Sequence, residues 1–65
     1  MYQITIKINI QVHNIEMDLS ELEDYGSIKA LTHNYIYWFM RMEGFYRDTV
    51  QSYYVTDSSG NKIEL

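Results

Sequence analysis

The sequence predicts an α+β fold, a small antiparallel sheet with one helix packed on one face. Residues 2–12 and 15–19 each alternate between apolar and polar side chains, which is the pattern of strands with one buried face. Residues 28–43 repeat their apolar side chains at helical spacing, and residues 46–65 are again typical of strands. We expect the order strand–strand–helix–strand–strand, or strand–helix–strand–strand if residues 15–19 do not pair.

The first two strands are expected to join at a two-residue turn, His13-Asn14. Asn tolerates the left-handed backbone conformation that such turns require. The apolar side chains occupy even positions before this turn and odd positions after it. Folding back there would therefore bring both sets to one face of the sheet. The expected pairs are Val12 with Ile15, Ile10 with Met17, and Ile8 with Leu19.

The helix is predicted to run from Ile28 to Glu43, with Ser27 as its N-terminal cap. Gly44 is suited to end it, and Phe45 can then fold back on Met40 in a Schellman motif. We expect one stripe of this helix to cover the apolar face of the sheet. That stripe consists of Ile28, Leu31, Tyr35, Trp38, Phe39 and Met42.

Two polar segments outside the helix are typical of turns. Ser20 and Glu23 have the spacing of a capping box, which is consistent with one helical turn in residues 20–25. Residues 57–60, with Asp first and Gly last, suit a type I turn. A hairpin closing at this turn would place Val55 near Ile63 and Tyr53 near Leu65.

Length and composition limit the class of protein. Residues 1–65 form one domain, and a domain of this length buries only about 60% of the surface that its unfolded chain exposes. With no Cys to form disulfides, we expect it to gain stability by oligomerising or by binding a partner. Residues 1–25 lack the pattern of a signal peptide, and the longest apolar stretch, residues 35–40, is too short to span a bilayer. We therefore expect a cytoplasmic protein that does not bind membranes.

The charge argues against direct binding of nucleic acid. Nine acids against five bases give a formal charge of −4, and the Lys and Arg residues are scattered along the chain. Tyr54 on the open face of the sheet could stack with bases. However, Glu16, Asp18 and Glu64 would share that face and repel a polyanion.

No catalytic, cofactor-binding or metal-binding constellation is recognisable. His13 lies in the expected turn and His33 on the helix, and neither has a second His at metal-ligand spacing. The serines are expected at caps and turns, except Ser52, which is expected within a strand, and none shows the base and orienting group that a nucleophile needs. The glycines are isolated and do not form a phosphate-binding loop. We expect a protein that is not an enzyme and that holds neither cofactor nor metal.

An acidic cluster is the first candidate for a binding site. Five carboxylates lie within nine residues, with no base among them. They could imitate a phosphate backbone and occupy a basic groove of another protein. They could equally be the solvated face of a strand followed by acids at a helix start, where the helix dipole favours them. The cluster consists of Glu16, Asp18, Glu21, Glu23 and Asp24.

The second candidate is a strip on the helix outside the predicted core stripe. It is formed by His33, Ile36, Tyr37 and Met40. The chain has ten aromatic residues, more than so small a core can enclose, so some should lie at contact surfaces. The strip is expected to meet a partner or a second copy of the chain, unless the terminal hairpin or residues 20–26 cover it.

In size, acidity and aromatic content the chain resembles the small inhibitors that bacteriophages and mobile elements encode, a class that includes anti-CRISPR proteins and uracil-DNA glycosylase inhibitors. The resemblance implies a DNA mimic that blocks a basic surface of a nucleic-acid-handling protein in the cytoplasm of a bacterial host. In that case the acidic cluster would engage Lys and Arg of the target. Tyr37, Ile36 and Met40 would anchor the contact or pair two copies as a homodimer. The alternative is a self-associating structural protein with no inhibitory role.

Overall fold

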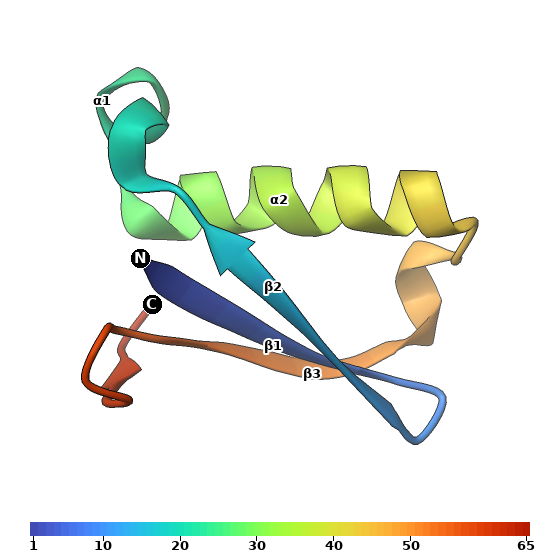
Figure 1. Cartoon of the computed structure of the whole chain (residues 1–65). Helices are drawn as coiled ribbons and strands as arrows, with labels where there is room; N and C mark the ends of the chain where they lie inside the picture. The colour runs from blue at the N-terminus through green and yellow to red at the C-terminus, as the bar shows by residue number, and fades with distance from the viewer.

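The chain folds with its elements in the predicted order (Figure 1). The computed structural model describes the backbone of residues 1–65 and every side chain except that of Arg47. The α+β class and the order strand–strand–helix–strand–strand are confirmed. The elements are β1 (Tyr2–Ile8), β2 (Gln11–Met17), the 3₁₀ turn η1 (Leu19–Glu21), α1 (Leu22–Tyr25), α2 (Ile28–Glu43), the 3₁₀ turn η2 (Arg47–Thr49), β3 (Val50–Thr56) and β4 (Lys62–Ile63).

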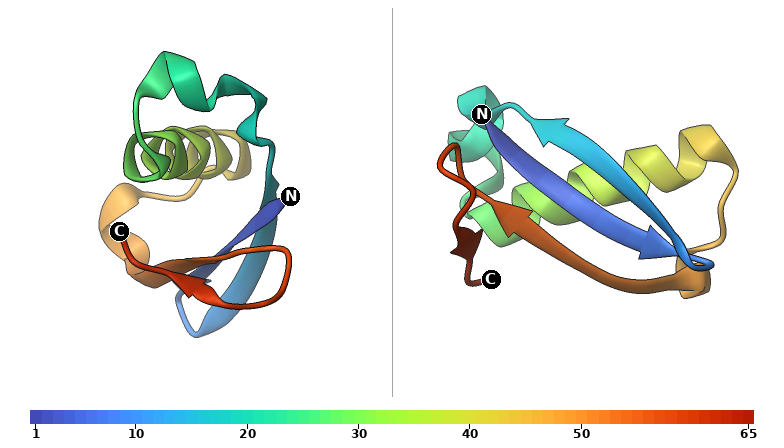
Figure 2. Two further views of the ribbon diagram at one scale, coloured as in Figure 1. Left: turned by 90° about the vertical axis from the view of Figure 1, so that its left-hand side faces the viewer. Right: turned by 60° about the horizontal axis from the view of Figure 1, so that its bottom comes forward.

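The four strands form one antiparallel sheet in the order β2-β1-β3-β4, and α2 lies across one face of it (Figures 1 and 2). The sequence predicts the two hairpins but not the pairing of β1 with β3 that joins them. In that ladder Ile4 lies opposite Val55, and Ile6 lies opposite Tyr53. The all-apolar face of β1 is therefore at the centre of the sheet, beneath the helix.

The first hairpin turns at Asn9–Ile10, so the prediction of a turn at His13-Asn14 is wrong. Both turn residues have positive φ, +48° for Asn9 and +64° for Ile10, as a type I′ turn requires. His13 instead lies within β2, opposite Ile6. The observed turn lets all seven residues of β1 pair with all seven of β2. A turn at residues 13–14 would pair residues 15–19 with residues 8–12 and would leave every residue of β1 before Ile8 without a partner in the second strand.

The different turn leaves the predicted buried face of β1 unchanged, but the two apolar residues that follow β1, Ile10 and Val12, are exposed instead of buried. The isoleucines at the even positions of β1 are buried. Ile10, expected opposite Met17, is 84% exposed at the turn. Val12, expected opposite Ile15, is exposed opposite Lys7, and Ile8 pairs with Gln11. The buried core consists of Ile4, Ile6, Ile8, Met17, Leu31, Met40 and Val55.

Hydrogen bonds at both ends of α2 confirm its predicted bounds. The Ser27 hydroxyl accepts from the N–H of Ala30 at 3.1 Å, which satisfies a free donor of the first turn. Gly44 ends the helix with φ +77°. The N–H of Phe45 then donates to the carbonyl of Met40 at 2.9 Å, the bond expected of a Schellman motif.

The buried face of α2 differs in part from the predicted stripe. Leu31 is fully buried, and Ile28, Tyr35 and Phe39 pack against the core as predicted. Trp38 and Met42 were also expected there, but they are 51% and 82% exposed.

The helix instead turns Thr32, Ile36 and Met40 towards the sheet. Met40 is only 5% exposed, and Thr32 is fully buried, where its hydroxyl donates to the sulfur of Met17 at 3.6 Å. Apolar side chains cover several faces of this helix, so the shape of the sheet decides which of them are buried.

The connection between β2 and α2 is helical, as predicted, but its cap is different. Asp18 precedes η1, and its carboxylate accepts from the N–H of Ser20 at 2.9 Å. The predicted capping box of Ser20 and Glu23 is therefore wrong. An Asp placed two residues before a free N–H competes for the same capping role.

The second hairpin closes at the predicted turn, residues 57–60. The N–H of its last residue donates to the carbonyl of its first at 3.0 Å. The pair of Val55 with Ile63 is confirmed. The ladder ends at Ile63, so the predicted pair of Tyr53 with Leu65 is wrong.

Candidate contact surfaces

The solvent-facing side of α2 carries a cluster of large side chains, which we call the aromatic ridge: Tyr37, Trp38, Arg41 and Met42. Tyr37 is 53% exposed, and Trp38 is exposed to the same degree. Single exposed apolar residues are common on protein surfaces, but neighbouring ones of this size mark contact sites. Trp, Tyr, Met and Arg are the residue types enriched at protein interfaces.

Contacts within the aromatic ridge fix its shape. The rings of Tyr37 and Trp38 meet edge to face, with centroids 5.4 Å apart and planes at 87°. The guanidinium carbon of Arg41 lies 5.9 Å from the centroid of the Trp38 ring. The Nη1 of Arg41 donates to the Tyr37 hydroxyl at 3.3 Å. Arg41 follows Trp38 by three residues and Tyr37 by four, and these spacings make it a neighbour of both rings on the helix surface.

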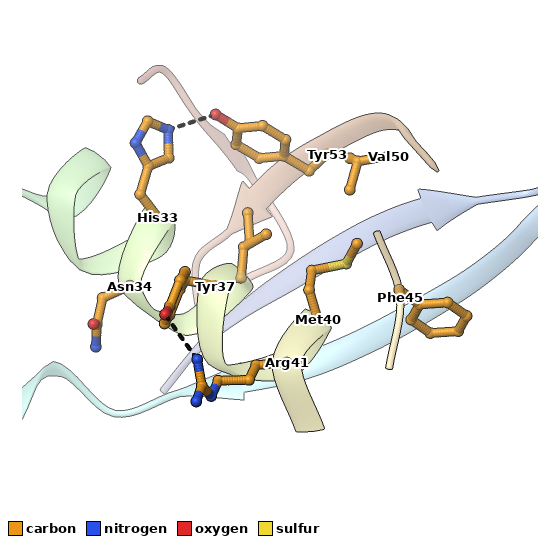
Figure 3. Close-up of a pocket in the computed structure, with 9 residues that line it drawn as sticks. His33, Asn34, Tyr37, Met40, Arg41, Phe45, Val50 and Tyr53 are labelled. Carbon is orange, nitrogen blue, oxygen red and sulfur yellow. Dashed lines mark hydrogen bonds between the residues drawn. The ribbon is translucent and has the colours of Figure 1, made fainter. Parts of the chain in front are cut away.

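A groove with a volume of about 720 Å³ lies between α2 and β3 (Figure 3). Four apolar side chains that pack on the core form its floor: Ile36, Met40, Phe45 and Val50. A hydrogen bond of 2.7 Å between the Nε2 of His33 and the hydroxyl of Tyr53 joins the helix to the strand across the groove. Tyr37 and Arg41 of the aromatic ridge form part of its rim.

The four helix residues predicted to form a contact strip, His33, Ile36, Tyr37 and Met40, all line this groove. They do not form an exposed strip, because Met40 belongs to the core and Ile36 is half-buried. His33 and Tyr37 remain exposed at the rim. The strip is thus one wall of a groove, and β3 supplies the opposite wall. The spacing of residues along a helix cannot reveal a wall that a distant strand provides.

The predicted acidic residues are all exposed along one continuous segment, from the end of β2 through η1 to α1: Glu16, Asp18, Glu21, Glu23 and Asp24. Figure 1 shows α1 beside the first turns of α2. Glu21 lines a second hollow, of about 480 Å³, together with Tyr25, Trp38 and Met42. The acidic segment and the aromatic ridge therefore border each other.

Trp38, Arg41 and Met42 were not among the predicted contact residues. A signal for them exists, because Arg41 follows Tyr37 by one helical turn and Met42 follows Trp38 by one turn. The prediction placed Trp38 and Met42 in the core stripe instead. Large apolar residues on a helix do not by themselves show which face a sheet covers.

His13 occupies a different environment from the exposed turn that was expected. It is half-buried, and its ring centroid lies 5.5 Å from that of Phe39 and 5.6 Å from that of Phe45. Its Nε2 is buried and has no hydrogen-bond partner among the described side chains and backbone. Within the part of the chain that is described, no three His, Asp or Glu side chains are arranged to hold a metal ion.

The chain matches no protein-family model, no curated protein and no solved structure. No helix among the described residues combines the length and the apolar character that crossing a bilayer requires. The aromatic ridge, the acidic segment and the groove are therefore the features that bear on function.

Proposed function

We propose that this protein is a non-enzymatic protein-binding module whose partner presents a basic surface. One observation carries the proposal: the aromatic ridge on α2 borders the exposed acidic segment, with Trp38, Met42 and Glu21 around one hollow. Exposed aromatic residues beside several charges of the same sign are typical of protein interfaces. In such interfaces a few buried aromatic side chains hold the partner, and the charges determine which partner binds.

The two parts of the surface have different roles in this proposal. The carboxylates of Glu21, Glu23 and Asp24 attract Lys and Arg of the partner over distances of about a Debye length. This attraction raises the association rate, and added salt weakens it. Tyr37 and Trp38 lose their solvent-exposed area in the complex and slow its dissociation. The contacts of Arg41 with both rings hold them in place before binding.

In its more specific form, the proposal is an inhibitor that mimics DNA and occludes the nucleic-acid-binding surface of a bacterial host protein. The run of five exposed acids supports this form, as does the resemblance in size and charge to inhibitors of phages and mobile elements. Direct binding of nucleic acid is less well supported. Tyr54 lies on the outer face of the sheet beside Lys62, but exposed Glu16 lies on the same face and would repel a polyanion.

The experiment is affinity capture from a bacterial lysate with three baits: the natural chain, a variant with Glu21, Glu23 and Asp24 changed to Lys, and a control. The control changes three exposed acids outside the segment, Glu43, Asp48 and Glu64, to Lys, so that its net charge equals that of the variant. We expect proteins with basic surfaces to be captured by the natural chain and the control but lost from the variant. Capture should also fall steeply from about 50 mM to about 500 mM salt.

Circular dichroism establishes that each bait is folded. Equal capture by the folded variant and the natural chain would show that the acidic segment does not bind the partner. Equal loss from the variant and the control would show that only net charge matters. Either result contradicts the proposal.

Self-association is the second candidate function, and the exposure of Met42 at 82% favours it, because a lone chain leaves this large side chain in water. Sedimentation velocity should then show a dimer that is insensitive to salt and that Trp38→Glu or Met42→Glu dissociates. Met40 is unsuitable for this test, since a charge at a core position would unfold the chain.

A further inference from the structure

The groove between α2 and β3 differs in charge from the rest of the molecule. The chain has nine acids and five bases, yet no Asp or Glu is among the described residues that line the groove. Its charged and titratable groups are the guanidinium of Arg41 and the imidazole of His33, with the hydroxyls of Tyr37 and Tyr53 beside them. An anion at this rim would therefore meet the guanidinium of Arg41 and no carboxylate among the residues that line the groove.

Arg41 is held in position at this rim but still has free donors. One of its N–H groups donates to the Tyr37 hydroxyl at 3.3 Å, and its guanidinium lies over the ring of Trp38. A guanidinium carries five N–H donors in a fixed plane, a geometry that matches the two oxygens of a carboxylate. Because two aromatic side chains already restrain Arg41, binding a carboxylate would cost it less conformational entropy.

The floor of the groove is apolar and adaptable. Ile36, Phe45 and Val50 supply aliphatic and aromatic surface, and Met40 is an unbranched side chain that can change rotamer to fit a ligand. The volume of about 720 Å³ lies within the range of small-molecule sites. From Arg41 to His33 the rim extends over eight residues of helix, about 12 Å.

We propose that this groove binds an amphipathic monocarboxylate, a small molecule with one carboxylate and an apolar body such as a medium-length acyl chain. The carboxylate pairs with Arg41, and the apolar body lies on Ile36, Met40 and Val50. Charge complementarity selects this ligand: one guanidinium matches one carboxylate, and a cationic amphiphile would be repelled. The inference goes beyond the proposed protein-binding function and does not depend on it.

The test compares octanoate, 1-octanol and octylammonium, which are unbranched compounds of the same carbon number and differ in the charge of the head group. Binding is followed by the fluorescence of Trp38, the only tryptophan, and by NMR shifts of the methyl groups of Ile36, Met40 and Val50. We expect octanoate to bind about ten times more tightly than octanol, as one charge-assisted hydrogen-bonded pair would give. Octylammonium should bind more weakly than octanol.

Two variants locate the charge effect. Arg41→Gln keeps hydrogen-bond donors but removes the charge, and it should lower the affinity for octanoate to that for octanol. Lys29→Gln removes an exposed cation from the first turn of α2, outside the groove, and it should leave both affinities unchanged. Arg41 and Lys29 are both exposed, so neither change should unfold the chain.

Three results would overturn the proposal. The first is equal affinity for octanoate and octanol in the natural chain, which would mean an apolar patch without charge recognition. The second is octanoate binding that Arg41→Gln leaves intact. The third is methyl shifts that depend on protein concentration rather than on octanoate, which would identify a second copy of the chain as the occupant of the groove.

Discussion

The two hairpins of this protein close in opposite ways. The turn of the second hairpin is stabilised by its own residues, because the Asp57 carboxylate accepts from the N–H groups of Ser59 at 2.9 Å and Asn61 at 3.0 Å. Gly60 takes the left-handed conformation there, with φ +85°. The turn of the first hairpin places Ile10, a β-branched residue, in that same left-handed region at φ +64°. For such a side chain this conformation is strained.

Different interactions stabilise the two turns. Two paired residues follow Asp57–Gly60 in β4, so the turn's own hydrogen bonds must hold that hairpin. The first hairpin has a seven-residue ladder and three buried isoleucines in β1, which are enough to hold Ile10 in an unfavourable conformation. Three substitutions test this account, in order of decreasing expected effect.

Ile6→Ala should have the largest effect. Ile6 is fully buried at the centre of β1, opposite His13 on one side and Tyr53 on the other. Truncating it leaves a cavity in the core and should lower the free energy of unfolding by about 2 to 5 kcal/mol, measured by urea denaturation. Lys7→Ala, on the exposed face of the same strand, is the control and should change stability by less than about 0.5 kcal/mol. Similar losses for both would mean that the ladder is not held by its buried face.

Asp57→Ala should have a smaller effect, confined to the second hairpin. It removes the acceptor of two backbone N–H groups and should lower the free energy of unfolding by about 1 to 2 kcal/mol. Asp57→Asn keeps one acceptor oxygen and should lose less. Amide hydrogen exchange should show the opening limited to β4 and the end of β3. If β1 and β2 open to the same extent, the two hairpins are not independent in the way that we describe.

Ile10→Gly should have the smallest effect and the opposite sign. Glycine adopts positive φ without strain, so this change should raise the free energy of unfolding by about 0.5 to 1 kcal/mol, which is a few degrees in Tm. Ile10→Ala removes the β-branch but keeps a Cβ at positive φ, so it should raise Tm by less than Ile10→Gly does. Stabilisation by alanine equal to that by glycine would point to the exposed sec-butyl side chain, rather than to φ, as the source of the penalty.

Many residues of the candidate site could be predicted from the sequence. The residues that were wrongly predicted share a physical cause. The acidic residues are predictable because charged side chains seldom leave water, and all five of them are exposed. The residues of α2 around the groove were found by helical spacing, but spacing cannot assign depth. Met40 was therefore expected at the surface and lies in the core, while Trp38 and Met42 were expected in the core and lie at the surface.

Local chemistry determined the class of fold, the bounds of α2 and the turn at Asp57–Gly60, because caps, glycines and side-chain periodicity act over a few residues. Tertiary structure alone decided the turn at Asn9–Ile10. In a strand pattern with a period of two, moving the turn so that every partner shifts by an even number of residues leaves the same side chains on the same face. The pattern therefore fits several positions of the turn, and the length and burial of the paired strands select the one at Asn9–Ile10. It also decided which face of α2 meets the sheet and brought β3 beside the helix to make the groove.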